Sequence, residues 1–256
     1  DQPRSRGLGD VYKRQTEGYA DDIVIMVKGK FPSTVSELMQ SAFNLIQGWC
    51  LQVGLKINPD KISVIPFTKK RKTINQLKSL TLFNKEVTYK NEMKYLGVIL
   101  DKTLTFNSHL THVIQKATLS LWTCKKMIGN SWGLTPKMAY YMYTVVIRPM
   151  ITYASIVWWK KTNQKTTEIQ LNKFQRRACF MITGGMKTTP TVGMEALIGL
   201  PPLHLFIQSQ ALDTNYKFSI SELTEVRDVT DNQLNRVQSE YDTHGFCISD
   251  YMLSKY

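Results

Sequence analysis

The chain has 256 residues and carries 33 Lys and Arg against 20 Asp and Glu, which gives a formal net charge of +13. Hydrophobic residues make up 43% of the sequence and charged residues 21%, values that exclude a wholly disordered polypeptide. The four cysteines contain no C-x₂-C pair, which argues against a zinc ribbon, a redox dithiol and a disulfide scaffold. We expect them to be small buried hydrophobic residues in a reducing compartment.

The positive charge is unevenly distributed along the chain. Residues 1–190 hold 29 Lys and Arg against 11 Asp and Glu, a net charge of +18, whereas residues 191–256 hold 4 against 9, a net charge of −5. A strongly basic body favours a polyanionic partner, because neutralising phosphates releases their condensed counterions. The charge alone leaves open that the basic surface is merely solvated.

Neither the N-terminal segment nor the most apolar stretch of the chain predicts a secreted or membrane protein. The N-terminal segment DQPRSRGLGDVYKRQ lacks the apolar region of a secretory signal. Residues 140–159 are apolar enough to resemble a membrane span, but Arg148 and Pro149 stand at their middle. We therefore expect a soluble protein in which this stretch is a buried helix, broken or bent near Pro149.

The first part of the chain predicts a mixture of strands and helices. We expect residues 1–17 to be an unpatterned leader, which a non-native origin would explain. The helix that follows should begin at Ser33, capped by Ser33 or Thr34, and end at Gly54. The strand segments predicted from apolar runs are residues 23–27, 62–67, a hairpin within 80–89, and 94–100.

Beyond residue 104 the hydrophobic period changes from 2 to 3.6, which predicts helices only. The first helix should be capped near Asn107 or Ser108, and Thr135-Pro136 should open the second. A third helix is predicted over residues 166–183, followed by shorter helical pieces near Glu195 and over 203–218. Residues 219–256 are acidic and weakly patterned, typical of a linker. The fold class predicted is α+β, with the strands confined to the first part of the chain.

Tyr19-Ala20-Asp21-Asp22, directly before an apolar strand, is the sharpest chemical signal in the sequence. Two adjacent carboxylates at the bend of a hairpin can hold divalent cations next to the phosphates of a nucleotide. Mg²⁺ in particular takes one or two carboxylates together with phosphate oxygens and water. The alternative is that Asp-Asp is simply a favourable turn dipeptide.

The order of several motifs resembles one protein family over about residues 18–218. The motifs are GYADDIVIMV (18–27), GWCLQVGLKINPDKISVIPF (48–67), KYLGVILDKTLTFNSHL (94–110), WGLTPK (132–137), YTVVIRPMITYASIVWW (143–159), TTPT (188–191) and PPLHL (201–205). In this order they resemble the reverse transcriptases of jockey-like non-LTR retrotransposons. The resemblance implies the C-terminal part of a polymerase palm over residues 18–104 and a helical thumb and connection over 105–218.

The resemblance also implies an activity and its partners. The intact parent would be an RNA-directed DNA polymerase that transfers nucleotides onto a DNA primer end with two Mg²⁺ ions, for which Mn²⁺ is the alternative. Its partners would be an RNA template, a DNA primer, the RNA–DNA hybrid and deoxynucleoside triphosphates, without a membrane. The family implies an intracellular location in the nucleus and cytoplasm.

Site residues follow from the resemblance only where this sequence matches the motifs. Asp21 and Asp22 would be catalytic metal ligands, and Tyr19 and Ala20 would lie beside the nucleotide and the primer terminus. Lys61 would lie near the triphosphate and protonate the leaving pyrophosphate, although a surface lysine remains the alternative.

The Tyr95-Leu96-Gly97 motif would form a primer-gripping strand. There Gly97 would permit close approach of the primer to the backbone. A simple bulge glycine is the alternative interpretation of Gly97.

The sequence departs from the family upstream of the YADD motif. The family uses a third aspartate on an earlier strand and a fingers region, and neither has matching residues here. We therefore expect this chain alone to be inactive as a polymerase. A catalytically inactive nucleic-acid-binding remnant is the alternative function, and an ordinary α+β protein with a chance YADD is the third.

Basic residues are frequent in the helical region. They include Lys116, Lys125, Lys126, Lys137, Lys160, Lys161, Lys165, Lys173, Arg176 and Arg177. We expect the lysines, with Lys116, Lys125 and Lys126 among them, to contact a nucleic-acid backbone, and a solvated basic face is the alternative. The tryptophans between them, among them Trp122 and Trp158, are expected to fill a core rather than to stack on bases.

Overall fold

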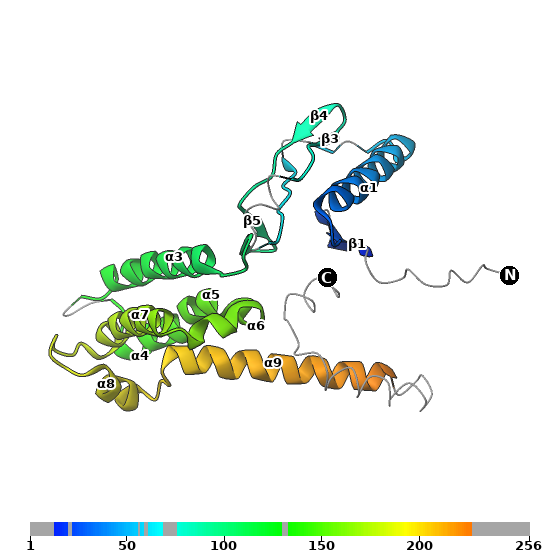
Figure 1. Cartoon of the computed structure of the whole chain (residues 1–256). Coiled ribbons are helices and arrows are strands. Elements are labelled where there is room, and N and C mark those ends of the chain that lie inside the picture. Colours follow the sequence, from blue (N-terminus) through cyan, green and yellow to red (C-terminus); the bar gives the residue numbers. More distant parts are fainter. Residues whose placement is uncertain are drawn as a thin grey trace. The chain divides into compact units, whose positions relative to one another are not determined.

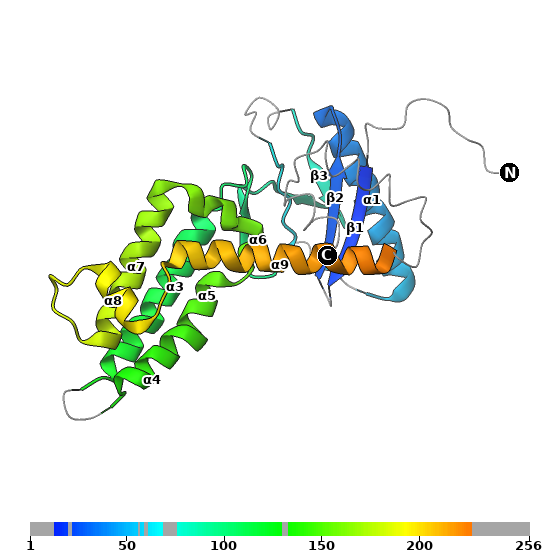
Figure 2. The same ribbon diagram turned by 90° about the horizontal axis from the view of Figure 1, so that it is seen from below.

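The structure is a computed structural model that describes residues 13–19, 22–55, 57–58, 61–68, 76–129 and 133–226 (Figures 1 and 2). The described residues divide into two compact units, the first ending at Thr105 and the second beginning at Phe106. Strands occur in unit 1, whereas the elements of unit 2 are helices, so the fold is mixed α and β as predicted.

Unit 1 begins with an antiparallel hairpin. Strand β1 (Lys13–Tyr19) pairs with β2 (Asp22–Lys28), and Tyr19 lies opposite Asp22 in the register. The strand predicted over 23–27 is confirmed within β2. The prediction that residues 1–17 are unpatterned is wrong from Lys13 onward. The sequence KRQTEGY has no apolar alternation, and it forms a strand because β2 offers it a complete ladder of backbone partners.

Helix α1 (Pro32–Val53) follows the hairpin and contacts both β2 and β3. Its start differs from the prediction, since Phe31 is the N-cap residue and makes no side-chain cap. Pro32 begins the helix instead, because its fixed φ suits the first turn and its missing N–H leaves nothing unsatisfied there. The predicted end is confirmed: Gly54 terminates the helix in the left-handed region with φ 74°.

Two further antiparallel hairpins complete unit 1. Strands β3 (Leu80–Leu82) and β4 (Lys85–Val87) confirm the predicted hairpin, and Phe83 and Asn84 form its turn with φ of 48° and 60°. Strands β5 (Glu92–Tyr95) and β6 (Val98–Asp101) occupy the segment predicted as one strand.

The single strand over 94–100 is therefore wrong, because Leu96 and Gly97 turn the chain. Their φ values of 42° and 84° are both positive, as a type I′ hairpin turn requires. The strand predicted over 62–67 is also reduced, to an isolated bridge between Val64 and Tyr89. Pro66 has no backbone N–H to donate to a ladder, which limits pairing in this segment.

The core of unit 1 joins α1 to the β3–β4 hairpin. Phe43 packs there with buried apolar residues of the hairpin, namely Leu80, Leu82 and Val87. Gln40 pairs with the backbone of β3: its Nε2 donates to the carbonyl of Thr81 at 2.8 Å, and its Oε1 accepts from the Thr81 N–H at 2.9 Å. The helix thus satisfies backbone groups that the short hairpin leaves open.

The end of β6 is organised by one carboxylate. Asp101 is buried, and its Oδ2 accepts hydrogen bonds from the backbone N–H and the hydroxyl of both Thr103 and Thr105, at 2.7 to 3.3 Å. Asp101→Ala removes four hydrogen bonds to a charged acceptor, so we expect it to cost about 2–3 kcal/mol of local stability. Hydrogen exchange of the 92–105 segment measures this as lost amide protection.

The control for this change is Asp22→Ala in the same unit. Asp22 is an exposed residue at the start of β2, whereas Asp101 is buried at the end of β6, so the removal of the Asp22 carboxylate should leave the amide protection of segment 92–105 unchanged. Equal protection in the Asp101→Ala variant and the unchanged chain would contradict the structural role of Asp101.

Unit 2 is a bundle of helices around a buried core (Figure 2). The long helices are α3 (Asn107–Lys126), α7 (Lys165–Thr183) and α9 (Leu203–Val226), and α3 and α9 each contact α7. The shorter elements between and after them are α4 (Pro136–Tyr141), the π-helix η2 (Met142–Ile147), α5 (Arg148–Thr152), α6 (Ser155–Trp158), the 3₁₀ helix η3 (Trp159–Asn163) and α8 (Thr191–Ile198).

The predicted helix boundaries in unit 2 are partly confirmed. Thr135 caps α4 as expected, its hydroxyl accepting from the Met138 N–H at 3.3 Å, and Gly184 ends α7 with φ 65°. The cap predicted at Asn107 or Ser108 is wrong: Phe106, with φ 56°, is the N-cap residue of α3 and makes no side-chain cap. Helix α9 also runs past residue 218 to Val226, and residues 227–256 lie outside the described residues.

The helix does not break at Pro149. Helical structure continues from α4 through η2 and α5, and it ends only where Tyr153 and Ala154 leave the helical region, Ala154 with φ 50°. The π-helix η2 ends at Ile147, two residues before Pro149. Its wider turns relieve the clash that the proline ring would make with the preceding turn of a regular α-helix. None of the helices in the described part of the chain is long and apolar enough to cross a membrane.

A polar network lies inside the core of unit 2. The Tyr143 hydroxyl of η2 donates to Gln175 Oε1 of α7 at 3.1 Å, and Gln175 Nε2 donates to Glu195 Oε1 of α8 at 2.7 Å and to the Pro201 carbonyl at 2.9 Å. Gln175 is therefore satisfied on both ends of its amide. Such a network fixes one relative arrangement of η2, α7 and α8.

His109 of α3 gives unit 2 a specific pH dependence. Burial lowers the pKa of His109 to about 4, with a smaller contribution from nearby His112. An unfolded histidine has a pKa of about 6.5, so the unfolded chain binds a proton first as the pH falls. We expect this histidine to contribute nothing to the pH dependence above about pH 6.5 and to reduce stability progressively between about pH 6.5 and 4.

Urea unfolding at pH 7 and pH 5 measures the effect. His109→Gln should lose less stability between these two pH values than the unchanged chain does. His112→Gln is the control, because His112 is exposed, and it should keep most of the original pH dependence. The same pH dependence in all three proteins would show that His109 is not the source.

Candidate functional site

The hairpin β1–β2 presents a carboxylate to solvent at its closed end. Strand β2 is half-buried from Val24 to Val27, where it runs past α1, and exposed at Asp22 and Ile23. Tyr19, opposite Asp22, is 56% exposed. The apolar part of the strand thus anchors the hairpin, and its end carries Tyr19 and Asp22 out into solvent.

Ala20 and Asp21, the two residues between this pair, lie outside the described residues. The described donor at the hairpin end is therefore the carboxylate of Asp22, a hard oxygen ligand that suits Mg²⁺ or Mn²⁺. Among the described residues, no group of three or more His, Cys, Asp and Glu side chains could hold a metal ion by itself. The donor chemistry fits a cation that keeps water and substrate oxygens as ligands.

The other predicted site residues of unit 1 lie in separate turns. Lys61 is exposed, and its backbone N–H donates to the Asn58 carbonyl at 3.2 Å. Tyr95 is half-buried at the end of β5, and Leu96 and Gly97 form the turn that leads into β6. The primer-gripping segment predicted as a strand is therefore the turn of a hairpin.

The predicted basic residues of unit 2 fall into two groups. Lys116, Lys125 and Lys126 are exposed on α3, where a polyanion can reach them. Arg176 of α7 is instead occupied within the protein. Its guanidinium donates to the Thr191 hydroxyl and the Lys187 carbonyl, each at 2.8 Å, and stacks on Phe180 at 4.7 Å. Arg176 therefore has its partners within the protein in this structure.

Two tryptophans of unit 2 differ in their exposure to solvent. Trp158 is 1% exposed and fills the core as predicted, in a T-shaped contact with the His109 ring at a centroid distance of 5.8 Å. Trp122 of α3 is 62% exposed, contrary to the prediction that it fills the core. Its helix position could have revealed this, because Trp122 falls outside the stripe of Leu110, Ala117 and Leu121 that faces the core.

The described thiols are inert side chains of the core. Cys50, Cys124 and Cys179 are buried and unpaired, as predicted, and Cys247 lies outside the described residues. Burial raises the pKa of the Cys179 thiol to about 11 and also raises that of Cys124. Both thiols are therefore neutral at physiological pH and poor nucleophiles or metal ligands.

Comparisons with known proteins match both units. Residues 5–100 match the family described as reverse transcriptase (RNA-dependent DNA polymerase). The chain is 23% identical over 203 residues to a retrovirus-related Pol polyprotein from type-1 retrotransposable element R1 of Bradysia coprophila, and 23% identical over 190 residues to one from Nasonia vitripennis. It is 26% identical over 140 residues to the RNA-directed DNA polymerase from mobile element jockey of Drosophila funebris.

These alignments cover different shares of the two partners. They include 79%, 73% and 55% of this chain but only 20%, 56% and 15% of the respective relatives. An alignment of 203 residues is longer than the 105 residues that precede unit 2, so the similarity extends into unit 2. No solved structure matches the chain.

Proposed function

We propose that this chain, which is a reverse-transcriptase segment of the non-LTR retrotransposon type, contributes a catalytic hairpin and a nucleic-acid-binding helical unit to an RNA-directed DNA polymerase. Unit 1 corresponds to the C-terminal part of the palm, and unit 2 to the thumb and connection. The observation that carries the proposal is the exposed carboxylate of Asp22 at the end of hairpin β1–β2, within the residues that match the reverse transcriptase family.

Asp21 and Asp22 would hold Mg²⁺, or alternatively Mn²⁺, at the end of this hairpin. When bound, the ions supply positive charge that stabilises the phosphates during nucleotidyl transfer. The role of the hairpin is positional: β2 is anchored by its half-buried residues, so Asp22 is held on a regular strand rather than on a loop.

The remaining residues of unit 1 would position the substrates. Tyr19, exposed opposite Asp22, offers a ring and a hydroxyl beside the metal ligands, together with Ala20. The exposed ammonium of Lys61 would approach the triphosphate and protonate the leaving pyrophosphate. The Leu96-Gly97 turn, after Tyr95, would contact the primer through its backbone, since Gly97 has no side chain to obstruct it.

Unit 2 would bind the template and primer by contacting their phosphates. Lys116, Lys125 and Lys126 are exposed on α3, and the chain as a whole carries a net charge of +13. Cations on a regular helix can follow a phosphodiester backbone without reading its sequence. The partners would be the RNA template, the DNA primer and the hybrid that the two form, with deoxynucleoside triphosphates as substrates.

The proposal is tested on the purified 256-residue chain by fluorescence anisotropy with a labelled 20-base-pair RNA–DNA hybrid. We expect the affinity to fall steeply as KCl rises from 50 to 200 mM, because each neutralised phosphate releases counterions. We also expect no incorporation of nucleotides by this chain alone. Binding that is absent, or that is insensitive to salt, would contradict the proposed function of unit 2.

A further inference from the structure

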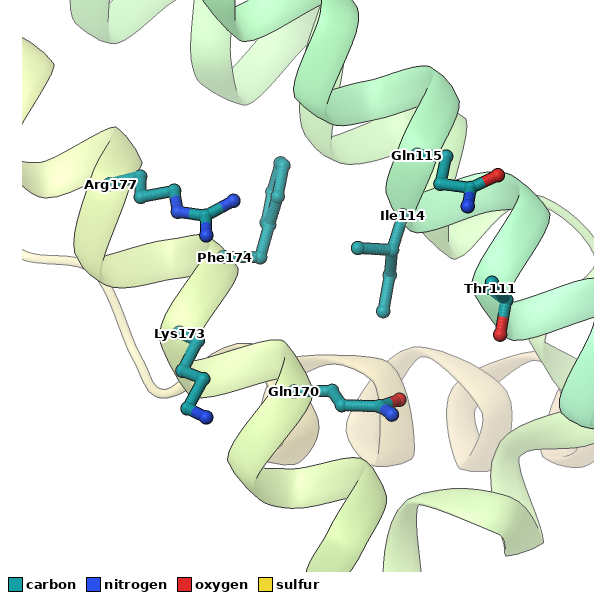
Figure 3. A pocket seen from close by; sticks show the side chains of 7 residues that line it. All are labelled: Thr111, Ile114, Gln115, Gln170, Lys173, Phe174 and Arg177. Carbon is teal, nitrogen blue, oxygen red and sulfur yellow. The ribbon is translucent and has the colours of Figure 1, made fainter.

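A groove of about 240 Å³ lies between helices α3 and α7 of unit 2 (Figure 3). Its apolar floor is formed by Ile114 of α3 and Phe174 of α7, whose side chains lie between the two helices. Phe174 is 1% exposed and belongs to the core of unit 2, whereas Ile114 is half-buried. The groove therefore lies over the contact between α3 and α7.

The walls of the groove carry only neutral polar and positively charged side chains. Lys173 and Arg177 project from α7 one helical turn apart, and Gln170 precedes them on the same face (Figure 3). Thr111 and Gln115 line the α3 side. All five side chains can donate hydrogen bonds, and no carboxylate is among the lining residues.

The two cations of the groove are available to a ligand. Within the described part of the chain, neither Lys173 nor Arg177 makes a hydrogen bond or an ion pair with the protein, and both are exposed. The adjacent Arg176, by contrast, is bound to Thr191 and to the Lys187 carbonyl. Helix α7 thus has one arginine that holds the fold together and one that faces outward into the groove.

The α3 wall continues beyond the groove as a polar stripe with one aromatic residue. Thr111, Gln115, Thr118, Trp122 and Lys125 follow one another at spacings of four and three residues, so they share one face of the helix. Trp122 on this face is 62% exposed. The stripe extends the groove by about two turns and ends on a further exposed cation.

We infer that the α3–α7 groove binds the phosphodiester backbone of a nucleic-acid strand, with Lys173 and Arg177 contacting phosphates. The phosphates of such a backbone present acceptor oxygens only, which matches a lining of donors without carboxylates. The inference rests on the proposed function and specifies it, since it adds two phosphate contacts on α7, in this groove, to those proposed for α3.

The test compares two variants that each remove two positive charges. Lys173→Gln/Arg177→Gln removes the cations of the groove, and Lys187→Gln/Lys217→Gln removes two exposed cations that do not line it. Binding of a labelled 20-base-pair RNA–DNA hybrid and of a labelled 20-nucleotide DNA strand is measured between 50 and 200 mM KCl. Circular dichroism verifies that each variant keeps its helices.

We expect the groove variant to bind at least about tenfold more weakly, with a slope of log K against log[KCl] less steep by about 1–2. The control variant should keep the slope of the unchanged chain to within about half a unit. The probe with the larger loss identifies the ligand of the groove as duplex or single strand. Equal losses in both double variants would overturn the inference.

A gain-of-charge variant tests the same site without weakening the fold. Gln115→Lys adds a cation from the α3 wall and should steepen the salt slope by about 1. An unchanged slope would overturn the inference. If the unchanged chain binds both probes in a salt-dependent manner and the groove variants do not alter it, the groove is excluded and the proposed function stands. A poly-glutamate competitor tests the other ligand class. If it displaces the hybrid from the unchanged chain but not from the Lys173→Gln/Arg177→Gln variant, and both proteins bind the hybrid with the same slope of log K against log[KCl], the ligand of the groove is an acidic peptide and the inference is wrong.

Discussion

Replacing Asp21 by Asn should abolish DNA synthesis by a longer polypeptide that contains this segment together with the upstream part of the family. The change keeps the size of the side chain but removes the negative charge that attracts the metal ions. We expect Mg²⁺-dependent incorporation on an RNA template to fall by about 10³-fold or more. Binding of the RNA–DNA hybrid should change by less than about twofold, since the basic helices of unit 2 are unaltered.

Asp213→Asn is the matched control for this change. Asp213 is an exposed residue of α9, so the same chemical substitution there should leave synthesis unaltered. Asp22→Asn should behave like Asp21→Asn if both carboxylates are metal ligands. Full synthesis by the Asp21→Asn variant would exclude Asp21 as a catalytic residue, and the catalytic assignment of the hairpin would be lost with it.

Trp158→Ala should destabilise unit 2 by about 3–5 kcal/mol. The indole is 1% exposed, makes a T-shaped contact with the His109 ring, and donates from Nε1 to the Tyr153 carbonyl at 3.2 Å. Its removal leaves a cavity in the core and takes away the hydrogen bond to the Tyr153 carbonyl. A loss of this size is a large fraction of the stability of an ordinary domain.

Trp122→Ala is the control, because it removes the same side chain from a position that is 62% exposed. We expect this variant to lose less than about 1 kcal/mol. Urea unfolding of both variants, followed by circular dichroism at the helix band, gives the comparison. Similar losses at the two positions would contradict the burial difference on which the placement of α3 and α6 depends.

The sequence was most informative where local backbone chemistry decides the structure. Gly54 and Gly184 mark helix ends because the left-handed conformation there suits glycine, and both ends are as predicted. The helix starts were less predictable. Ser33 and Asn107 are good capping residues, but Phe31 and Phe106 occupy the N-cap positions instead, and neither makes a side-chain cap.

The sequence also did not predict the residues other than glycine that adopt a positive φ. The Leu96-Gly97 turn divides KYLGVIL into two strands, although the Tyr, Val and Ile residues of this segment favour an extended conformation throughout. Leucine rarely adopts a φ of 42°, so only the pairing of Tyr95 with Val98 reveals the turn. The same holds for Ala154, whose φ is 50°: the sequence predicted a break or bend near Pro149, but helical structure continues to Thr152 and ends just before Ala154.

The candidate site also has features that the sequence predicts and features that depend on tertiary packing. The YADD motif and the order of the matched segments could be read from the sequence, because they are local and the family is recognisable by them. The sequence could not show which of the positively charged side chains face outward. Arg176 and Arg177 are neighbours of identical chemistry, and only the packing of α7 on α8 and α3 determines that one is bound within the protein and the other lines a groove.

The most direct test of the central claim is to read the source DNA upstream of the codon for Asp1. The claim is that hairpin β1–β2 carries two of the carboxylates of a polymerase. It predicts an upstream reading frame, continuous with this one, that encodes an apolar strand with a further aspartate and a fingers region. An upstream frame that is continuous but encodes neither would contradict the catalytic role of Asp21 and Asp22.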